Sequence, residues 1–240
     1  MRASELTEHR LDVENLHVHY GNVCALENIS LQMHCGECVA LLGRNGTGKS
    51  TLLKSIAGLI KTATGHVNWC GEPLALRRHE VGYLPQREDV DWNFPVTVRG
   101  LVEMGRFPQV GWFGHFGKKD HEAVDRALVS MGLEDLQHRQ IAELSGGQQQ
   151  RTFIARALAQ EAHVFLLDEP FAGLDAPSQE NLAGLMRKLA KEDHLVIASH
   201  HDLQTAPEIF SRAVVLNRTM IAEGPVLEVL PYLTEEKYAS

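Results

Sequence analysis

The sequence predicts an α/β fold that has a mainly parallel sheet as its core, an antiparallel β part near the N-terminus and an inserted helical subdomain. Two observations predict this fold. Short apolar runs of strand length alternate with stretches of helical periodicity, which is typical of a parallel sheet covered by helices on both faces. The composition then changes between Glu88 and Gln140, where aromatic residues and glycines crowd 92–117 before apolar residues recur at helical spacing.

The elements before the insertion follow in order. In residues 16–20 and 29–33 apolar side chains alternate with polar ones, which predicts two half-buried strands joined by a loop around Gly21 and Asn22. Residues 39–42 are uninterruptedly apolar, as in a strand buried on both faces. The other elements expected here are a helix over 48–57 and short strands over 67–69 and 81–84.

After residue 147 the alternation of helices and strands returns. Helical spacing of Leu182, Leu185, Met186 and Leu189 predicts one amphipathic helix, and compact apolar runs predict strands. The expected elements are a helix over 147–159, a strand over 164–167, a helix over 179–190, and strands over 195–198 and 214–216.

The overall composition excludes several classes of function. Of the 240 residues 44% are apolar, so the chain can bury a sizeable core, and its formal net charge of −8 argues against recruiting nucleic acid or anionic lipid. No apolar run approaches the ~20 residues that span a bilayer, and residues 1–10 contain no signal-peptide core. We therefore expect a cytosolic chain whose four cysteines are reduced thiols.

A phosphate-binding loop is the strongest local signal. The segment from Gly43 to Ser50 reads GRNGTGKS, directly after an expected strand and at the start of an expected helix. This spacing fits a P-loop, in which glycines let backbone N–H groups point at the β-phosphate and the helix dipole adds positive potential. Lys49 would reach the β- and γ-phosphates, and the Ser50 hydroxyl would bind Mg²⁺. The predicted ATP-binding residues of this loop are Gly43, Arg44, Asn45, Gly46, Thr47, Gly48, Lys49, Ser50 and Thr51.

Two acidic residues complete the expected phosphate chemistry. Asp168 and Glu169 follow the apolar run 164–167, which predicts that they lie at the end of a buried strand. A P-loop enzyme needs a carboxylate near Mg²⁺ and a group that activates the attacking water. We assign the first role to Asp168 and the second to Glu169.

A third motif carries a family resemblance. Residues 144–151 read LSGGQQQR, and this segment resembles the signature motif of ATP-binding cassette (ABC) ATPases. Its glycines at a helix start would form a second anion site. The resemblance implies that Ser145, Gly146, Gly147 and Gln148 close on the ATP bound to the opposite protomer. It therefore implies a dimer of this chain with two ATP molecules at the interface.

The resemblance assigns four further residues. Tyr20 stands where an aromatic ring stacks on adenine, and a half-buried strand aromatic remains the alternative. Gln86 resembles the hinge glutamine that reaches Mg²⁺ or the attacking water. Asp175, in the segment AGLD, resembles the aspartate that communicates across the dimer. His201 precedes Asp-Leu and resembles the switch histidine at the γ-phosphate, whereas His200 is the less favoured candidate.

These motifs imply a domain organisation and a role. Residues 11–87 and 148–230 would form a RecA-like P-loop core with its β subdomain, 88–147 a helical subdomain that carries the signature motif, and 231–240 a C-terminal tail. The catalytic set would be Glu169, His201, Gln86 and Lys49, with Ser50, Gln86 and Asp168 at Mg²⁺. As in the family, separate permease subunits would hold the cassette at the cytoplasmic face of the membrane.

The segments from 83 to 98 and from 104 to 113 look like the insertion of cassettes that energise manganese, zinc or iron uptake. Exposed aromatic residues such as Trp92, Phe94 and Trp112 would suit a contact with the permease near 88–116, although they could pack within the subdomain instead. An extracytoplasmic metal-binding protein would then be an indirect partner. The alternatives are the cassette of an exporter or a non-transport ABC ATPase. Cys35 and Cys38 have a CxxC spacing, but ordinary turn residues are the preferred interpretation.

Overall fold

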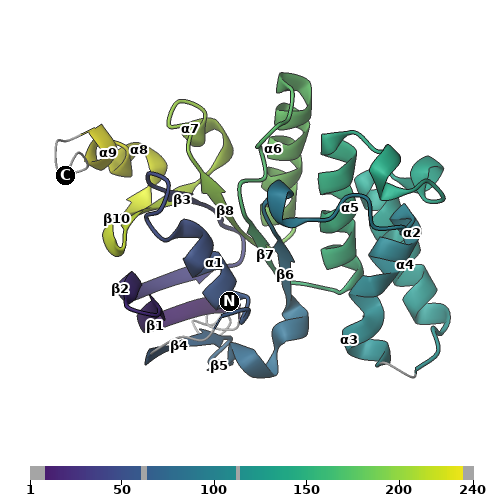
Figure 1. The fold of residues 1–240 in the computed structure, drawn as a ribbon, viewed down its shortest axis with the longest axis horizontal. Helices are drawn as coiled ribbons and strands as arrows, with labels where there is room; N and C mark the ends of the chain where they lie inside the picture. Colours follow the sequence, from purple (N-terminus) through teal and green to yellow (C-terminus); the bar gives the residue numbers. More distant parts are fainter. Residues whose placement is uncertain (1–8, 61–63, 112–113, 235–240) are drawn as a thin grey trace, which may run out of the picture.

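The structure is a computed structural model that describes residues 9–60, 64–111 and 114–234. Its strands form two sheets that lie side by side in Figure 1. The antiparallel sheet has the order β2-β1-β4-β5, and the second sheet has the order β10-β9-β3-β8-β7-β6. In the second sheet β9, β3, β8, β7 and β6 run parallel, and β10 pairs antiparallel with β9. The predicted α/β class is confirmed.

The strands of the antiparallel sheet are β1 Arg10–Tyr20, β2 Val23–His34, β4 Thr64–Trp69 and β5 Glu72–Pro73. The second sheet contains β3 Cys38–Leu42, β6 Val81–Leu84, β7 Val164–Leu167, β8 Leu195–His200, β9 Arg212–Asn217 and β10 Thr219–Pro225. The helices are α1 Lys49–Ile56, α2 Val98–Glu103, α3 Phe107–Val110, α4 Lys118–Met131, α5 Gly146–Ala159, α6 Ala176–Lys191, α7 Ala206–Ile209, α8 Val226–Val229 and α9 Pro231–Thr234.

The expected strand over 16–20 was too short. β1 begins at Arg10, and its apolar residues Leu11 and Val13 are buried like Leu16 and Val18, with Asp12 buried between the first two. The register shifts between Val13 and Leu16, where Asn15 has a φ of 47°. Because this bulge places two exposed residues in succession, the period of two breaks and the first half of the strand is lost to a pattern search.

The strand over 214–216 was also too short, and β10 was missed. Only the middle of β9 is fully buried, whereas β10 has no buried residue along its length. It is the edge strand of its sheet, and its register shifts between Met220 and Ala222. An edge strand with this burial has no apolar period by which its sequence could be recognised.

The parallel sheet divides the interior into two cores. Successive side chains of a strand point to opposite faces. Ala40 and Leu42 of β3 accordingly join the core with α5 and α6, whereas Val39 and Leu41 join the core with α1 and the antiparallel sheet. Leu52 and Leu53 of α1 are fully buried in the second core. Helix α1 is therefore fixed on the sheet from which its P-loop emerges.

The helices α2, α3 and α4 gather beside α5 at the right of Figure 1, and α5 also packs against β6. Helix α5 packs against both α2 and α4, and its residues Phe153, Ile154 and Ala157 are buried. The helix that begins in the signature motif thus joins the inserted helices to the core.

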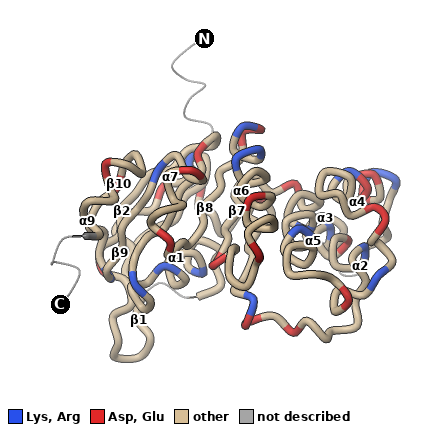
Figure 2. The backbone as a smooth tube through the Cα atoms, turned by 90° about the horizontal axis from the view of Figure 1, so that it is seen from above, with Lys and Arg blue, Asp and Glu red and all other residues tan. Residues whose placement is uncertain are grey.

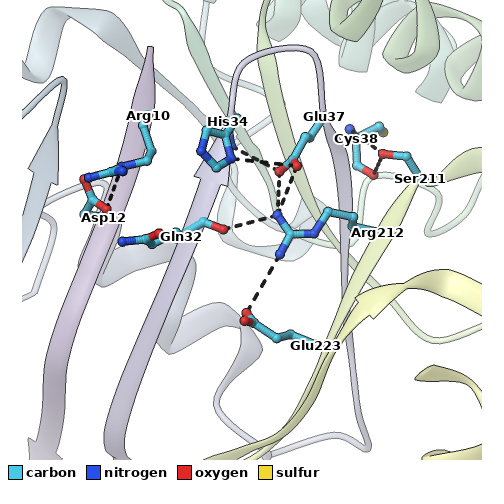
Figure 3. Close-up of polar contacts among 9 residues, drawn as sticks. All are labelled: Arg10, Asp12, Gln32, His34, Glu37, Cys38, Ser211, Arg212 and Glu223. Carbon is cyan, nitrogen blue, oxygen red and sulfur yellow. Dashed lines mark hydrogen bonds and ion pairs between the residues drawn. The ribbon is translucent and has the colours of Figure 1, made fainter. Parts of the chain in front are cut away.

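A polar cluster joins the two sheets (Figure 3). Arg212 of β9 donates from Nη1 to both carboxylate oxygens of Glu37, at 3.0 and 2.9 Å, and to the Gln32 carbonyl of β2 at 3.2 Å. Its Nη2 lies 4.0 Å from Oε2 of Glu223 on β10. A charge-assisted contact to two oxygens fixes orientation better than a single hydrogen bond. This cluster fixes β2 beside the edge of the parallel sheet.

Candidate nucleotide site

The loop between β3 and α1 has the backbone of a phosphate cradle. Gly43, Gly46 and Gly48 have φ values of 152°, 81° and 102°, which side-chain-bearing residues rarely adopt. At Gly48 space is restricted as well, because a Cβ there would lie 2.5 Å from Leu26 Cδ2 and 2.9 Å from the Ala25 carbonyl oxygen. The loop can follow this path only with glycine at that position.

Lys49 lies inside this loop. Its Nζ donates to the carbonyl oxygens of Gly43 at 2.8 Å and Arg44 at 2.9 Å, so the ammonium group is held against the first residues of the loop. Burial lowers the pKa of Lys49, and the negative charges of Glu169 and Asp168 oppose that shift. The two carboxylates thus favour the charged form of the ammonium group, which is the form that binds an anionic ligand.

Asp168 is the centre of the polar network at the carboxyl ends of the strands. It is 1% exposed, and its Oδ1 accepts hydrogen bonds from Ser50 Oγ at 2.9 Å and Ser199 Oγ at 2.8 Å. Gln86 Nε2 donates to the same Ser50 hydroxyl at 3.0 Å. The structure thus brings together three residues from distant segments that the sequence assigned to Mg²⁺.

Tyr83 adds a fourth group to this network. Its hydroxyl donates to Asp168 Oδ2 at 3.5 Å. Burial, followed by the negative charge of Asp168, raises the pKa of Tyr83. The phenol therefore stays protonated and acts as a donor to the carboxylate.

Glu169 has a strained backbone. Its φ is 48°, a conformation that is uncommon outside glycine, and its N–H donates to Ser199 Oγ at 2.6 Å. Strain of this kind costs of order 1–3 kcal/mol and persists where surrounding contacts hold it, typically at functional sites. The chain therefore turns directly after Asp168, and Ser199 holds this turn.

Ser199 is a site residue to which the sequence interpretation assigned no role. It is 1% exposed and bonds both Asp168 and the Glu169 backbone. The available signal was a hydroxyl at the end of the apolar run 195–198. Its meaning depends on the pairing of β8 with β7, which places Ala198 beside Leu167.

The two histidines after Ser199 have different surroundings. His200 is 4% exposed, its Nε2 lies 3.0 Å from Thr205 Oγ1, and its ring packs edge-on against Phe171 at 5.3 Å. Burial, followed by the charge of His201, lowers the pKa of His200. His201 is exposed and lines a cleft of about 280 Å³ together with Gly173 and Asp202. His200 lines this cleft too, but its buried ring packs against Phe171, whereas the ring of His201 is exposed and accessible to a ligand.

The signature motif begins α5. Ser145 is the N-cap, its N–H donates to Gln148 Oε1 at 2.9 Å, and its Oγ accepts from Gln148 N at 3.4 Å, which is a capping box. A Cβ on Gly147 would lie 3.2 Å from Ser178 Oγ, so α5 and α6 begin close together.

Asp175 caps α6 in the same way. Its Oδ1 accepts from Ser178 N at 3.1 Å, and hydrogen bonds from the Ser178 side chain and backbone lower the pKa of Asp175. The signature residues and the predicted communication residue therefore lie at neighbouring helix starts, with both Ser145 and Asp175 exposed.

The aromatic residues that the sequence singled out differ in their exposure to solvent. Tyr20 ends β1 and is 50% exposed, so its ring is accessible. Phe94 is 52% exposed, whereas Trp92 is half-buried and packs edge-on against Phe153 at 5.6 Å. Trp112 lies outside the described residues.

Cys35 and Cys38 pack into different cores on opposite faces of the sheet, which prevents them from holding one ion between them. Burial raises the pKa of each thiol to about 12, so both stay protonated at neutral pH. Ordinary packing thus explains the CxxC spacing.

Comparison with known proteins identifies the family. Residues 26–172 match the family model described as ABC transporter. The chain belongs to the ABC transporter ATPase family. The fold class and the ABC ATPase predicted from the sequence are confirmed.

Curated relatives cover most of the chain. A manganese transport system ATP-binding protein, MntB of Halalkalibacterium halodurans, is 44% identical over 90% of this chain and 86% of its own. The zinc transport system ATP-binding protein TroB of Treponema pallidum is 41% identical over 96% and 85%. The chelated iron transport protein YfeB of Yersinia pestis is 42% identical over 90% and 74%.

Solved structures agree with the fold. A transporter described as metal-chelate type, in an inward-facing conformation, matches with a TM-score of 0.81 and 29% identity, covering 92% of this chain and 85% of the other. A bacterial ABC transporter cassette solved as a dimer matches with a TM-score of 0.76 and 27% identity, covering 90% and 98%. Within the described residues, no helix of this chain is long and apolar enough to cross a bilayer.

Proposed function

We propose that this chain is the ATP-hydrolysing subunit of an ABC importer that energises uptake of manganese, zinc or iron through a separate permease. The observation that carries the ATPase part is the convergence of Lys49, Ser50 and Asp168 beneath the P-loop, with Glu169 beside them. The metal part is supported by the relatives, whose names include manganese, zinc and chelated-iron transport systems.

ATP would bind with its phosphates in the P-loop. The backbone amides around Gly46 and Gly48 and the start of α1 supply positive potential there. The Lys49 ammonium group would exchange its contacts with the Gly43 and Arg44 carbonyls for phosphate oxygens. Tyr20, exposed at the end of β1, would stack on the adenine ring.

The donor groups next to the P-loop would fit Mg²⁺. Ser50 and Asp168 bring a hydroxyl and a carboxylate to within 2.9 Å of each other, and the Gln86 amide reaches the same hydroxyl. Hard oxygen donors of this type are preferred by Mg²⁺ over softer ligands. When bound, Mg²⁺ would neutralise charge on the β- and γ-phosphates.

Hydrolysis is phosphoryl transfer to water, in which positioning and charge stabilisation dominate. Glu169 would accept the proton of the attacking water, and its strained backbone fixes the direction of its carboxylate. His201, which is exposed at the cleft that Gly173 and Asp202 also line, would contact the γ-phosphate. Lys49 would stabilise the negative charge that develops on the transferred group.

A second copy would complete each site. α5 begins at Ser145, Gly146 and Gly147, where the positive end of the helix dipole lies. This end of the helix suits the γ-phosphate of ATP bound to another protomer. Asp175 at the start of α6 would communicate between the two protomers across the same interface. A related cassette solved as a dimer supports this arrangement.

The permease contact is proposed for residues 88–116. Phe94 and Phe107 are each 52% exposed in this segment, and exposed aromatic side chains are typical anchors of protein interfaces. The permease would hold the cassette at the cytoplasmic face of the membrane, and an extracytoplasmic metal-binding protein would deliver cargo on the other side. Lys and Arg lie interspersed with Asp and Glu along the backbone in Figure 2, and the formal net charge is −8, so the charge pattern argues against a nucleic-acid partner.

Two measurements test this proposal. We expect Glu169→Gln to bind ATP and dimerise while kcat falls by about 10²–10⁴. Turnover close to that of the unmodified protein would contradict the role of Glu169. Uptake of radioactive manganese, zinc and iron into cells lacking this chain should fall for at least one metal and recover with the intact gene. Unchanged uptake of all three would contradict metal import.

A further inference from the structure

Arg87, which directly follows Gln86, lies across the start of the signature helix. A Cβ on Gly146 would lie only 2.5 Å from Arg87 Nη1, and a Cβ on Gly173 would lie 4.0 Å from the same atom. The guanidinium group therefore rests on the bare backbone of the signature motif and approaches the loop that leads to Asp175. One side chain thus connects three segments of the nucleotide site.

Trp92 holds Arg87 in this place. The Arg87 Cζ atom lies 5.7 Å from the centroid of the Trp92 ring, and Trp92 Nε1 donates to the Arg87 carbonyl oxygen at 2.8 Å. The same indole packs edge-on against Phe153, further along α5. The segment after Gln86 is therefore attached to α5 both at its start, through Arg87, and within its body, through Trp92.

Charge pairing does not account for the position of Arg87. Among residues 9–60, 64–111 and 114–234, no carboxylate forms an ion pair with it. The start of α5 carries the positive end of the helix dipole, which disfavours a cation. The side chain nevertheless lies there, exposed to solvent. Packing against the Gly146 backbone and stacking on the Trp92 ring keep the guanidinium group there despite this repulsion.

We propose that Arg87 is a positioning residue that keeps the signature start of α5 and the loop 172–175 in register with the Gln86 segment. A second copy would then meet Ser145 and Asp175 as parts of one preformed surface. The cost of ordering these segments would be met before dimerisation, which strengthens association. This inference rests on the proposed nucleotide-sandwich dimer.

The test uses the full chain with Glu169→Gln, so that bound ATP persists. Sedimentation measures the dissociation constant of the ATP-bound dimer for this parent and for Arg87→Met, which keeps the length of the side chain without its guanidinium group. Lys118→Met is the matched control, because Lys118 is a 92% exposed cation on α4. Arg87→Lys tests rescue, since an ammonium group can still lie over the Trp92 ring.

We expect Arg87→Met to raise the dimer dissociation constant about tenfold or more, equivalent to about 1.4 kcal/mol. ATP affinity of the dilute protomer and the thermal midpoint should stay unchanged, Lys118→Met should match the parent, and Arg87→Lys should recover most of the loss. Trp92→Leu should weaken the dimer as well, and its effect should not add to that of Arg87→Met, because both act on one contact.

Parent-like dimerisation of Arg87→Met would overturn the inference, as would equal weakening by Lys118→Met, which would indicate an effect of net charge alone. A lower thermal midpoint together with weaker ATP binding by the protomer would also overturn it, since the role of Arg87 would then be general stability. If the parent itself does not dimerise with ATP, the proposed function fails instead.

Discussion

The Ser199 hydroxyl lies 2.8 Å from Asp168 Oδ1 and 2.6 Å from the backbone nitrogen of Glu169, so one buried side chain contacts both the carboxylate predicted to bind Mg²⁺ and the backbone of the predicted general base. It donates to the first and accepts from the second. This arrangement holds the strained turn at Glu169, where φ is 48°.

Ser199→Ala should therefore lower kcat while ATP binding is retained. The Glu169 N–H would lose its partner, which costs about 1–3 kcal/mol for a buried group, and the Glu169 carboxylate would no longer be held in one direction. We expect a fall in kcat of about tenfold or more, since displaced catalytic groups lose positioning.

Ser55→Ala is the matched control for Ser199→Ala. Ser55 is 4% exposed and its hydroxyl donates to the Thr51 carbonyl within α1, so a buried hydroxyl is removed away from the carboxylates. Steady-state ATPase assays with nucleotide-binding titrations separate the two variants. An equal loss of kcat in both would show that Ser199 has no special role.

The P-loop could be predicted from the sequence because its chemistry is local. Gly43 to Ser50 lie in one segment, and their order alone implies the strand, the cradle and the helix. The acid pair was equally local, since Asp168 and Glu169 end an apolar run.

The contribution of Ser199 could not be predicted, because it depends on which strands become neighbours. β7 and β8 are separated by α6 in the chain, and only their parallel pairing brings Ser199 to Asp168. Sheet order is decided by packing over the whole domain, and a local sequence pattern carries no information about it. The same holds for Arg87, whose contacts on Gly146 and Gly173 join three separate segments.

The two neighbouring histidines should respond differently to substitution. His201→Ala should lower kcat by about 10²-fold or more without lowering the thermal midpoint, because His201 is exposed and free to contact phosphate. His200→Ala should lower the thermal midpoint, since it removes a ring buried against Phe171 and Phe210. Differential scanning fluorimetry and ATPase assays on both variants check this division. The reverse pattern would assign the switch role to His200.

Stability should fall as the pH drops below about 6.5, the ordinary pKa of histidine. Burial lowers the pKa of His200, so just below that pH the unfolded chain binds a proton there that the folded protein does not. Acid therefore favours the unfolded chain, by at most about 1.4 kcal/mol per pH unit for one such group.

In His200→Gln this dependence should be weaker between about pH 7 and pH 5, as followed by urea titrations. Gln retains a polar partner for Thr205 but does not titrate. His194, whose pKa burial also lowers, leaves a residual dependence in the variant. Identical pH dependence in both proteins would exclude His200 as a contributor.

Asp168→Asn should weaken Mg²⁺ binding and thereby shift ATPase activity to higher Mg²⁺ concentrations. The change preserves size but removes the negative charge that faces Ser50 and Lys49, so saturating Mg²⁺ concentration should rise and kcat should fall. Titrating activity against Mg²⁺ at fixed ATP measures both effects. Asp135→Asn, exposed between α4 and α5, is the matched control for loss of one carboxylate. Unchanged Mg²⁺ dependence in Asp168→Asn would remove Asp168 from the metal site.

Gly48→Ala should damage the P-loop for two separable reasons. The φ of 102° is strained for alanine, and the new Cβ would lie 2.5 Å from Leu26 Cδ2 and 2.9 Å from a backbone oxygen that cannot move aside cheaply.

Gly71→Ala isolates the first effect, because Gly71 has a φ of 77° with nothing within 4 Å of its Cβ position. Backbone strain alone costs of order 1–3 kcal/mol, so Gly71→Ala should lower stability by about that amount and leave ATP affinity intact. Gly48→Ala should lower stability further and weaken ATP binding, because α1 and the cradle must shift against β2. Chemical denaturation and isothermal titration with ATP distinguish the two variants, and equal behaviour would mean that the close approach to β2 plays no part.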